Sequence, residues 1–532
     1  MPSASPQLSW QYVEKWAETR PLDESLVFKG RRLNWSEVRA RVDATAKAFI
    51  AAGVGKGDRV ALLSMGCLEF PITFMAAAKI GAVWLGLSPK FTRPELAAIL
   101  TDARPNVLIG LREFNGNDLS SLLLDLRGDV PEIREVWVIG DPFDGAESFE
   151  ACTARPRPRL DETLGRMAAE VGPGDDLLLM YTSGSTGTPK GVIHTHRSTM
   201  TSVEIQNRHF GTREKSRLFM QFPINHVAAD VELGLAAIRA GATLVIEDRF
   251  DPAESLRIVE RERITFLGGV PAMFLLQFAT PEFKEVDLSS VETFVWGGSP
   301  APRAVVETLA KIASRTGARL VTGYGSTETG GFVTYSNPED DLQTLTRTAG
   351  CAARPVELRI VDEHRQRLSL GEPGEIAFRG PSLMRGYWNN ATATREVMDD
   401  EGWYYSGDVA WLDERGCLHM VGRTSEMYKT GGENVYPREV EEVLERHPAV
   451  ASAAVIGVAN TTYHEVGVAF LVLRSGASAT DEELRAHCRS ILANFKVPKY
   501  FECREKLPVL ASGKVDKLAL KRDVLPRFQV EY

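Results

Sequence analysis

Length, composition and charge exclude several classes of protein. The chain has 532 residues, 44% of them hydrophobic, and its formal net charge is -9. This length exceeds one ordinary domain, so we expect a large body with at least one smaller domain. The mild negative charge argues against nucleic acid as a partner.

The cysteines and the longest apolar run exclude further classes. The six cysteines show neither a CxxC pair nor a histidine cluster at zinc-ligand spacing, which fits a cytoplasmic protein without structural zinc. Residues 70–87 form the longest apolar region, but Pro71, Lys79 and Gly81 interrupt it. We therefore expect a core helix and a strand there rather than a membrane span.

The N-terminal part of the chain alternates between helix and strand patterns. Helical spacing of apolar residues covers 10–20, 34–52, a segment ending at Ile80, and 95–101. Strand patterns cover 59–64, 82–86 and 106–109. The alternation predicts a parallel α/β sheet, and the polar, proline-bearing segment 141–159 predicts a surface excursion.

A stretch rich in glycines and hydroxyls follows a predicted buried strand at 177–180. It reads Tyr-Thr-Ser-Gly-Ser-Thr-Gly-Thr-Pro-Lys-Gly over residues 181–191. Glycines let backbone N–H groups approach an anion, and hydroxyls add donors. We interpret the stretch as a polyphosphate cradle made by Thr182, Ser183, Gly184, Ser185, Thr186, Gly187, Thr188 and Lys190. The order Pro-Lys-Gly at its end does not match the Gly-Lys-Ser/Thr of a Walker A loop, which disfavours a P-loop ATPase.

The alternation resumes after the cradle. Predicted strands cover 243–246, 265–268 and 293–296, and predicted helices open at Pro252, Pro271 and Pro302. Short strand patterns over 356–378 predict a small antiparallel barrel or sheet, and 411–421 predicts a hairpin. The fold class we expect is α/β: a large N-terminal body of parallel α/β layers plus a small β-barrel, followed by a small mobile α+β domain.

A polar, glycine-bearing segment at 424–432 predicts a domain boundary. We expect an N-terminal domain over 1–422, a hinge over 423–430 and a C-terminal domain over 431–532. The C-terminal domain is expected to contain a helix at 437–446, strands at 453–458 and 466–473, and a helix opened by the capping box of Thr480 and Glu483.

The cradle stretch closely resembles the phosphate loop of the adenylate-forming enzymes, which include acyl- and aryl-CoA ligases, luciferases and the adenylation domains of peptide synthetases. Further motifs resemble that family in the same order. They are Gly-Tyr-Gly-Ser-Thr-Glu at 323–328, Trp-Tyr-Tyr-Ser-Gly-Asp at 403–408, Gly-Arg at 422–423 and Ser-Gly-Lys at 512–514. The resemblance covers nearly the whole chain. It implies an acyl-CoA ligase that uses ATP, Mg²⁺ and coenzyme A.

The resemblance also implies roles in nucleotide binding. Tyr324 would stack on adenine, Thr327 would meet phosphate, and Glu328 would hold Mg²⁺, which prefers oxygen ligands. Asp408 and Arg423 would bind ribose, and Gly298 and Gly325 complete the expected nucleotide site. Standing alone, Glu328 would be a solvated turn residue, Asp408 a turn cap and Arg423 a surface arginine.

The C-terminal domain would supply the catalytic lysine. By resemblance, Lys514 bridges the carboxylate and the α-phosphate and neutralises the charge that builds there. Thr186, Glu328 and His226 are the other candidate catalytic residues, and Gly432 would lie beside the pantetheine of CoA after the domain rotates. Lys517 is expected to be an ordinary surface lysine.

The segment Phe222–Ala228 resembles the one that carries an aromatic gate at the acyl pocket. His226 is the candidate gate, and a hydrogen-bonded core histidine is an equal alternative. Small residues at 228, 229, 297 and 298 indicate room for an acid bulkier than acetate. Asp230 falls at least one position from where an amino-acid ligand is expected, so an amino acid is not favoured. The expected pocket residues are His226, Val227, Trp296, Gly297 and Gly323.

The hinge and the acyl acceptor stay open at this point. Where the family usually has Asp or Lys as the pivot, this chain has Ser425 followed by Glu426, and either could serve. No carrier domain follows Lys517, which favours CoA over a carrier protein as the acceptor. A separate carrier protein and a non-catalytic nucleotide-binding protein remain alternatives. Members of the family are often dimers, so a homodimer is an open possibility.

Overall fold

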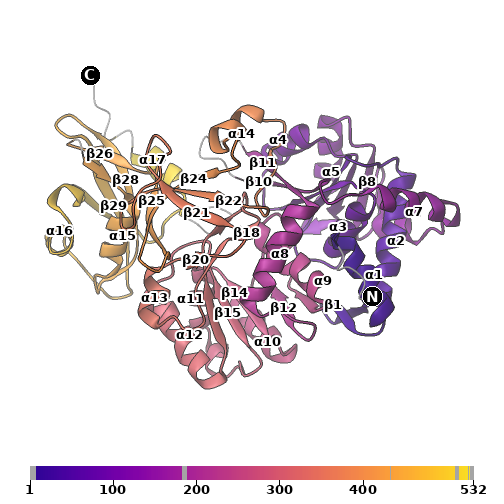
Figure 1. Cartoon of the computed structure of the whole chain (residues 1–532), viewed down its shortest axis with the longest axis horizontal. Helices are drawn as coiled ribbons and strands as arrows, with labels where there is room; N and C mark the ends of the chain where they lie inside the picture. Colours follow the sequence, from indigo (N-terminus) through magenta and orange to yellow (C-terminus); the bar gives the residue numbers. More distant parts are fainter. Residues whose placement is uncertain (1–6, 183–188, 432, 510–514, 525–526, 528–532) are drawn as a thin grey trace. The chain divides into compact units, whose positions relative to one another are not determined.

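The computed structural model describes residues 7–182, 189–431, 433–509, 515–524 and 527. The chain forms two compact units, the first made of Met1–Glu357 with Arg379–Tyr404, and the second of Leu358–Phe378 with Tyr405–Tyr532 (Figure 1). The sheet that precedes residue 423 thus belongs to the second unit, although the sequence placed it in the N-terminal domain. The predicted boundary at residue 422 marks the start of the expected hinge, and it stays a prediction.

An eight-stranded sheet forms one half of the first unit, in the order β23-β11-β10-β4-β3-β5-β8-β9. Its strands from β10 to β9 are parallel, whereas β11 and β23 run antiparallel to their neighbours. The bounds are β3 Arg59–Leu63, β4 Val83–Leu87, β5 Val107–Leu111, β8 Glu135–Ile139, β9 Glu147–Ser148, β10 Asp176–Thr182, β11 Lys190–Thr195 and β23 Gly386–Tyr387. The predicted parallel sheet is confirmed.

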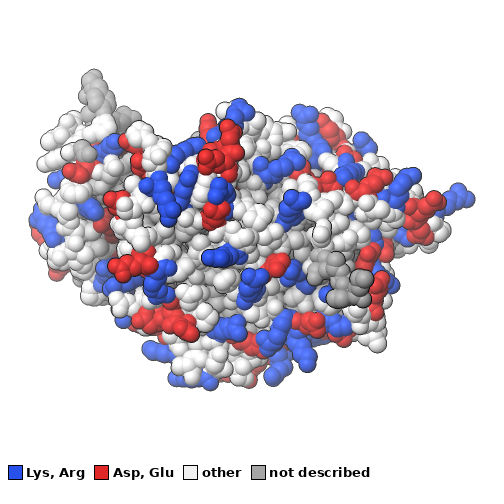
Figure 2. Space-filling model, viewed as in Figure 1, with Lys and Arg blue, Asp and Glu red and all other residues white. Residues whose placement is uncertain are grey.

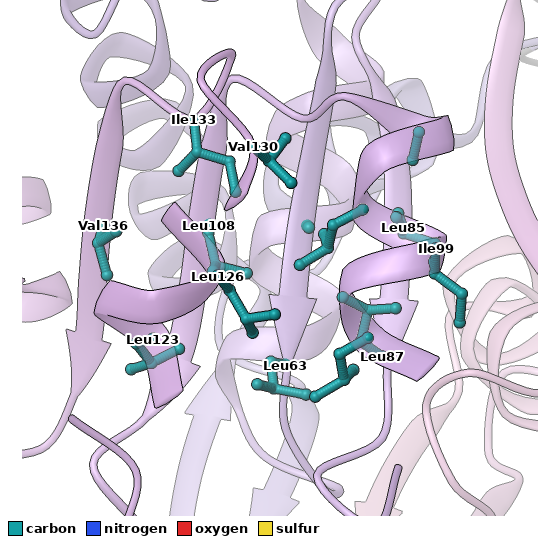
Figure 3. Close-up of a cluster of buried hydrophobic side chains, with 14 of the residues drawn as sticks. Leu63, Leu85, Leu87, Ile99, Leu108, Leu123, Leu126, Val130, Ile133 and Val136 are labelled. Carbon is teal, nitrogen blue, oxygen red and sulfur yellow. The ribbon is translucent and has the colours of Figure 1, made fainter. Parts of the chain in front are cut away.

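Helices cover this sheet because its strands are apolar on both faces. They are α2 Trp35–Ala51, α3 Glu69–Lys79, α4 Arg93–Ala103, α5 Ser120–Asp129, α6 Phe149–Ala154 and α7 Asp161–Glu170. Figure 3 shows the leucines and valines of the strands meeting Ile99 of α4 and Leu123 and Leu126 of α5 in one buried cluster. Burying each such side chain contributes about 1.5–3 kcal/mol.

The segment 141–159 is not wholly the surface excursion that its polarity predicted. Glu147–Ser148 pairs with β8 as strand β9, and α6 follows directly. Phe149 and Cys152 of this helix are buried, and the Phe149 ring lies 6.4 Å from that of Trp137. Strand pairing and buried apolar side chains together hold this stretch against the sheet.

A seven-stranded sheet forms the other half of the first unit, in the order β16-β15-β14-β12-β13-β1-β2. Its strands are β1 Glu24–Phe28, β2 Arg31–Asn34, β12 Arg217–Met220, β13 Thr243–Ile246, β14 Phe266–Gly269, β15 Thr293–Trp296 and β16 Arg319–Thr322. Its helices are α8 His196–Phe210, α9 Ala236–Ala240, α10 Pro252–Arg261, α11 Pro271–Phe278 and α12 Arg303–Thr316, and α1 Ser9–Thr19 begins the chain. The predicted starts at Pro252 and Pro271 are confirmed.

Shorter elements complete the first unit. Those that matter for the site are β17 Gly325–Ser326, which pairs with β18 Gly331–Phe332, and a π-helix, η2, over Ala228–Leu235. The others are β6 Glu113–Phe114, β7 Asn117–Asp118, β19 Thr334–Tyr335, β20 Cys351–Ala352, α13 Leu342–Arg347 and α14 Ala391–Val397.

The second unit contains two sheets. The first has the order β21-β22-β24-β25, with β21 Glu357–Val361, β22 Gly374–Arg379, β24 Tyr404–Leu412 and β25 Leu418–Arg423. The second contains β26 Tyr428–Thr430, β27 Glu433–Val435, β28 Val450–Asn460, β29 His464–Leu473 and β30 Tyr500–Cys503. Helices α15 Pro437–Glu445, α16 Asp481–Arg489 and α17 Lys517–Val524 pack with it. The predicted capping box of Thr480 and Glu483 opens α16.

The exterior agrees with the charge balance of the sequence. Lysines and arginines lie among aspartates and glutamates over the face displayed in Figure 2. Among the residues that the structure describes, every helix is too short or too polar to span a bilayer.

Candidate active site

The cradle stretch connects two paired strands. Residues 183–188 lie outside the described part of the chain, so the placement of Ser183, Gly184, Ser185, Thr186, Gly187 and Thr188 stays a prediction. The strands on either side are described: β10 ends at Thr182, β11 begins at Lys190, and these two residues are register partners. The antiparallel pairing of β10 and β11 therefore brings the two ends of the cradle together, both partly buried.

Lys190 and Glu328 are linked by a residue from a third segment. The hydroxyl of Tyr387 donates to Oε1 of Glu328 at 3.1 Å, and Nζ of Lys190 lies 5.1 Å from the centre of the Tyr387 ring. Burial, and then the charge of Glu328, raise the pKa of Tyr387, so its proton stays available for donation. Tyr387 is placed by the pairing of β23 with β11, in which it faces Val192. The two predicted nucleotide motifs thus contact the same residue, Glu328 at the hydroxyl of Tyr387 and Lys190 over its ring.

The second predicted nucleotide loop needs its glycines for space. A side chain at Gly323 would lie 2.0 Å from the Thr334 carbonyl oxygen, and one at Gly325 would lie 2.3 Å from that of Gly331. No real Cβ atom fits at these distances, so both positions need glycine. The backbone N–H of Tyr324 donates to Thr334 Oγ1 at 2.8 Å, which fixes the base of the candidate adenine-stacking residue.

A buried histidine, His194, binds the second nucleotide loop at Thr327. Nε2 of His194 lies 2.7 Å from the carbonyl oxygen of Thr327, and Nδ1 lies 3.2 Å from Ser198 Oγ. Because a carbonyl only accepts, Nε2 carries the proton. Burial lowers the pKa of His194 to about 4, so the ring is neutral at neutral pH. Thr327 is thereby tied to the strand that begins at Lys190.

The acyl-pocket candidates from β15 and β16 surround a phenylalanine. Gly297 and Gly323 follow the carboxyl ends of these adjacent parallel strands. A side chain at Gly297 would lie 2.2 Å from the Phe332 ring, and one at Gly323 would lie 3.0 Å from it. The space expected beside Gly297 therefore accommodates Phe332, and this ring limits the room for an acid there. Gly298 is exposed with φ +77°.

Trp296, the pocket candidate that precedes Gly297, is buried. Its side chain is 2% exposed and belongs to a buried cluster with Phe294 and Leu309. Alternation along β15 explains the placement, since Phe294 and Trp296 share one face of the strand. The side chain that we expected to line the pocket thus packs in the core of the sheet.

His226 precedes the π-helix and is exposed, which excludes the core-histidine alternative. Its Nδ1 accepts from the backbone N–H of Ala228 at 3.2 Å, and its ring lies 6.4 Å from that of Phe222, nearly parallel to it. Val227 is buried beside it. An exposed ring held at the start of a helix suits a gate, which stays a prediction.

In the second unit, the two candidate ribose residues are register partners on β24 and β25. Nε of Arg423 lies 2.7 Å from Oδ1 of Asp408, which is buried while Arg423 is exposed. The backbone N–H of Asp408 donates to Ser406 Oγ at 3.1 Å, and Gly407 before it has φ +72°. The structure therefore brings the two residues together with Oδ1 directed at an arginine.

The candidate hinge residues differ in their contacts. Ser425 is exposed between β25 and β26. Oε2 of Glu426 lies 2.5 Å from Nζ of Lys517, and that ammonium also lies 2.8 Å from Oε1 of Glu441. Only 21% of the Lys517 side chain is exposed, so the expectation of an ordinary surface lysine is wrong: two carboxylates draw it inward.

Gly432 and Lys514 lie outside the described residues, so their roles stay predictions. The chain on either side of 510–514 is closed by a bridge between Val509 and Val515, and the Asp516 N–H donates to the Pro508 carbonyl at 2.8 Å. The described residues on either side of residues 510–514 are therefore held together.

Sequence reasoning missed Tyr387, His194 and Phe332. Each acts through a contact with a distant segment, at separations of 59, 133 and 100 residues from Glu328, Thr327 and Glu232, respectively. Glycines precede Phe332 and Tyr387 in the sequence, but they give no indication of these distant partners. Only the position of His194 directly after the apolar pair Val192-Ile193, in a strand whose residues 191–194 are all buried, could have drawn attention to one of them.

Glu328 fits a single-carboxylate magnesium site. Its carboxylate is partly accessible, and Tyr387 occupies one side of one oxygen. Mg²⁺ commonly takes one or two carboxylates, with phosphate oxygens and water completing its shell. Within the described residues, no group of three or more His, Cys, Asp or Glu side chains forms a metal cage.

Comparisons with known proteins agree with this arrangement. Residues 13–388 match the AMP-binding enzyme family, and residues 439–514 match its C-terminal domain. A feruloyl-CoA synthase of Amycolatopsis sp is 35% identical over 502 residues, covering 94% of each chain. A long-chain-fatty-acid–CoA ligase of Mycobacterium tuberculosis is 33% identical over 500 residues, covering 92% of this chain and 93% of the relative.

The solved structures lead to the same family. An anthranilate CoA ligase in complex with anthranoyl-AMP superposes with a TM-score of 0.87 and 26% identity, covering 98% of both chains. The family matches span both compact units, and the two predicted nucleotide motifs of the first unit converge on Tyr387. The chain therefore belongs to the AMP-binding enzyme family, among its AMP-forming acyl-CoA ligases.

Proposed function

We propose that this protein converts a medium-sized or bulky, apolar or aromatic carboxylic acid into its CoA thioester by way of an acyl-AMP. The observation that carries the proposal is the convergence of Lys190 and Glu328 on Tyr387, which brings a cation and a carboxylate together beside the cradle. A polyphosphate with a bound divalent ion needs both charges within a few ångströms.

In the first step, a carboxylate oxygen of the acid attacks the α-phosphorus of ATP, and the bond to the bridging oxygen of pyrophosphate breaks. Lys190 lies at the end of the cradle and would neutralise charge on the departing phosphates. Mg²⁺ bound at Glu328 would screen the phosphate oxygens. His194 and the glycines at 323 and 325 hold Thr327 and Tyr324 in place, so catalysis rests on positioning and charge neutralisation.

Lys514 would complete the charge neutralisation in this step. Its ammonium would lie between the attacking carboxylate and the α-phosphate, where negative charge builds. The flanking residues Val509 and Val515 pair with each other. We place it on a domain that later rotates about Ser425 or Glu426 and withdraws it.

In the second step, the thiolate of CoA attacks the carbonyl carbon of the acyl-AMP and forms the carbon–sulfur bond. The bond between that carbon and the bridging phosphate oxygen breaks, and AMP leaves with its electrons. Gly432 would lie beside the pantetheine arm. Asp408 and Arg423 would hold the ribose hydroxyls of the nucleotide through both steps. A homodimer and a cytoplasmic location remain our expectations.

The breadth of the relatives leaves the acid open within this class. The two curated relatives carry the names of a feruloyl and a long-chain fatty acyl ligase. In this chain the Phe332 ring lies against Gly297 and Gly323, which favours acids that pack against a flat aromatic surface. An amino acid is disfavoured because both carboxylate oxygens of Asp230 are fully buried.

The test is an exchange assay with a panel of acids. Purified protein, ATP, Mg²⁺ and labelled pyrophosphate are incubated with aromatic, alicyclic, fatty and amino acids. We expect label to enter ATP only when an apolar or aromatic acid is present, and thioester to form when CoA is added. Exchange without any thioester from CoA would favour the alternative, an enzyme that loads a separate carrier protein. No exchange with any acid would contradict the proposal.

A further inference from the structure

Glu232 is the one partly accessible residue of the otherwise buried π-helix η2. The π-helix Ala228–Leu235 has eight residues, and the other seven are buried. Glu232 alone keeps part of its surface accessible, although its neighbours Val231 and Leu233 are apolar and buried. A carboxylate on the inward side of the molecule is costly to bury, so an accessible one in this place faces an open space.

The contacts of Glu232 locate that space. Its Oε1 accepts from the backbone N–H of Phe332 at 3.1 Å, and a side chain at Gly331 would lie 2.7 Å from the same oxygen. Phe332 in turn lays its ring against Gly297 and Gly323, the two glycines at the ends of β15 and β16. The carboxylate therefore lies at the wall that the proposed acyl pocket shares with the second nucleotide loop.

The side chain of Gln206 lies beside Glu232. A side chain at Gly331 would also lie 2.6 Å from Nε2 of Gln206, so this amide and Glu232 flank the same glycine. Nε2 donates to Ser202 Oγ at 2.6 Å and to the Gly330 carbonyl at 3.1 Å. Oε1 of Gln206 is buried and has no hydrogen-bond partner among the described residues.

No cationic side chain among the described residues neutralises the carboxylate of Glu232. Within the described residues, no Lys, Arg or His forms an ion pair with Glu232, and its one hydrogen bond there is to the Phe332 N–H. Burial raises its pKa to about 7. The second oxygen of Glu232 is therefore left without a protein donor among the described residues and can accept from a bound group.

From this arrangement we infer that Glu232 is a specificity-determining residue that accepts a hydrogen bond from a donor group, such as a hydroxyl or an amine, on the body of the acid substrate. The inference rests on the proposed function and narrows its substrate class to acids that carry a donor beyond the carboxylate. A substrate group that only accepts, such as an ether, finds no partner there.

The alternative is a structural role only, in which Glu232 does no more than hold the Phe332 N–H. The two roles differ in their consequences. A structural role changes turnover of all acids alike when Glu232 is replaced, because the whole wall shifts. A recognition role changes the ratio between an acid that bears a donor and the same acid without one.

The experiment measures that ratio by pyrophosphate exchange. The best acid of the panel is compared with matched acids in which one position carries a hydroxyl, an amine, a methoxy group or hydrogen. In the wild type, we expect kcat/KM for the hydroxyl or amine form to exceed that of the methoxy and hydrogen forms by at least about tenfold. In Glu232→Leu, we expect the ratio to fall to about one.

Two further variants keep the result interpretable. Glu232→Gln keeps an acceptor for the Phe332 N–H and nearly the same shape, so it should fold even if the leucine variant does not, and it should retain a preference for the hydroxyl while losing part of that for the amine. Asp230→Asn is the matched control, since Asp230 lies in the same helix but is fully buried. Its donor ratio should equal that of the wild type.

The inference is overturned if the wild type shows no donor preference, or if the preference survives in Glu232→Leu. A uniform loss with every acid in Glu232→Leu and wild-type ratios in Glu232→Gln would assign the residue a structural role only. Absence of exchange with every acid in the wild type is a different result: it contradicts the proposed function itself, and the inference then falls with it.

Discussion

The hydroxyl of Tyr387 donates to the carboxylate of Glu328 at 3.1 Å. Lys190 lies 5.1 Å from the centre of the same ring, so one side chain contacts the acid of one nucleotide motif and the cation of the other. A hydrogen bond to a charged acceptor contributes about 1.5–3 kcal/mol, and a cation over an aromatic face about 0.5–2 kcal/mol. Tyr387 thus positions both groups without being a member of either motif.

Two substitutions at Tyr387 separate these contributions. Tyr387→Phe removes the hydroxyl and keeps the aromatic face, so we expect kcat/KM for Mg·ATP in pyrophosphate exchange to fall about tenfold. Tyr387→Leu removes both contacts and should cost at least a few-fold more. Equal rates for the two variants would show that the ring contributes nothing, and wild-type rates for both would contradict the positioning role.

The pairing of Asp408 with Arg423 predicts a ribose effect. Asp408→Ala removes the acceptor for the ribose hydroxyls and leaves Arg423 without its 2.7 Å partner. We expect the KM for ATP to rise about tenfold and the preference for ATP over 2′-deoxy-ATP to shrink. Steady-state exchange with both nucleotides measures this. If the preference for ATP were unchanged while the KM rose, Asp408 would act through the fold rather than through ribose.

The ion pairs of Lys517 predict a local stability effect. Lys517→Met leaves Glu426 and Glu441 without their ammonium and should destabilise the second unit by about 2 kcal/mol, less than a fully buried pair because 21% of the side chain is exposed. Adding Glu441→Gln should recover part of the loss. Hydrogen exchange in α15 and α17 measures both, and additive effects of the two substitutions would contradict the coupling.

The same lysine gives a pH dependence with a defined sign. Burial alone lowers the pKa of Lys517, but the charges of Glu441 and Glu426 outweigh it and raise the pKa above its usual value. The contribution to stability is therefore present below pH about 10 and is lost as the pH rises through the raised pKa. Protection of α17 should decline above that pH in the wild type and not in Lys517→Met. Parallel curves would contradict this assignment.

His194 gives the opposite pH dependence. Burial lowers its pKa to about 4, so the unfolded chain binds a proton at a higher pH than the folded chain does. Stability is present above pH about 6.5 and is lost as the pH falls toward 4, by about 3 kcal/mol for a shift of this order. His194→Gln still donates to Thr327 but does not titrate. The difference in the free energy of unfolding between wild type and variant should narrow by that amount on acidification. A constant difference across this pH range would contradict the prediction.

Local chemistry explains what the sequence predicted well. Asp251 accepts from the N–H groups of Ala253 and Glu254 at the start of α10, and Gly317 adopts φ +75° at the end of α12. Caps of this kind depend on residues within one turn, which the sequence shows directly. The predicted helix starts at Pro252 and Pro271 are confirmed for the same reason, whereas α12 begins at Arg303, one residue after the predicted Pro302.

Tertiary contacts explain the rest. Lys517 was expected at the surface, because nothing near it in sequence shows that Glu426 and Glu441 converge on it. Trp296 was expected in the pocket, but the alternation of β15 directs it into the core. Tyr387 links Glu328 to Lys190, and His194, on the same strand as Lys190, binds Thr327, yet Tyr387 and His194 come from strands that only the fold brings together. Sequence motifs therefore identify the candidate site residues, and only the fold identifies the residues that connect them.

The most direct test of the account separates the two half-reactions in Lys514→Ala. We predict that acyl-AMP formation in this variant, measured by pyrophosphate exchange, falls at least about a hundredfold. We also predict that the same variant converts supplied acyl-AMP and CoA to thioester at close to the wild-type rate, with unchanged thermal unfolding. Equal loss of both half-reactions in a folded variant would contradict the account, because Lys514 would then not be withdrawn between them.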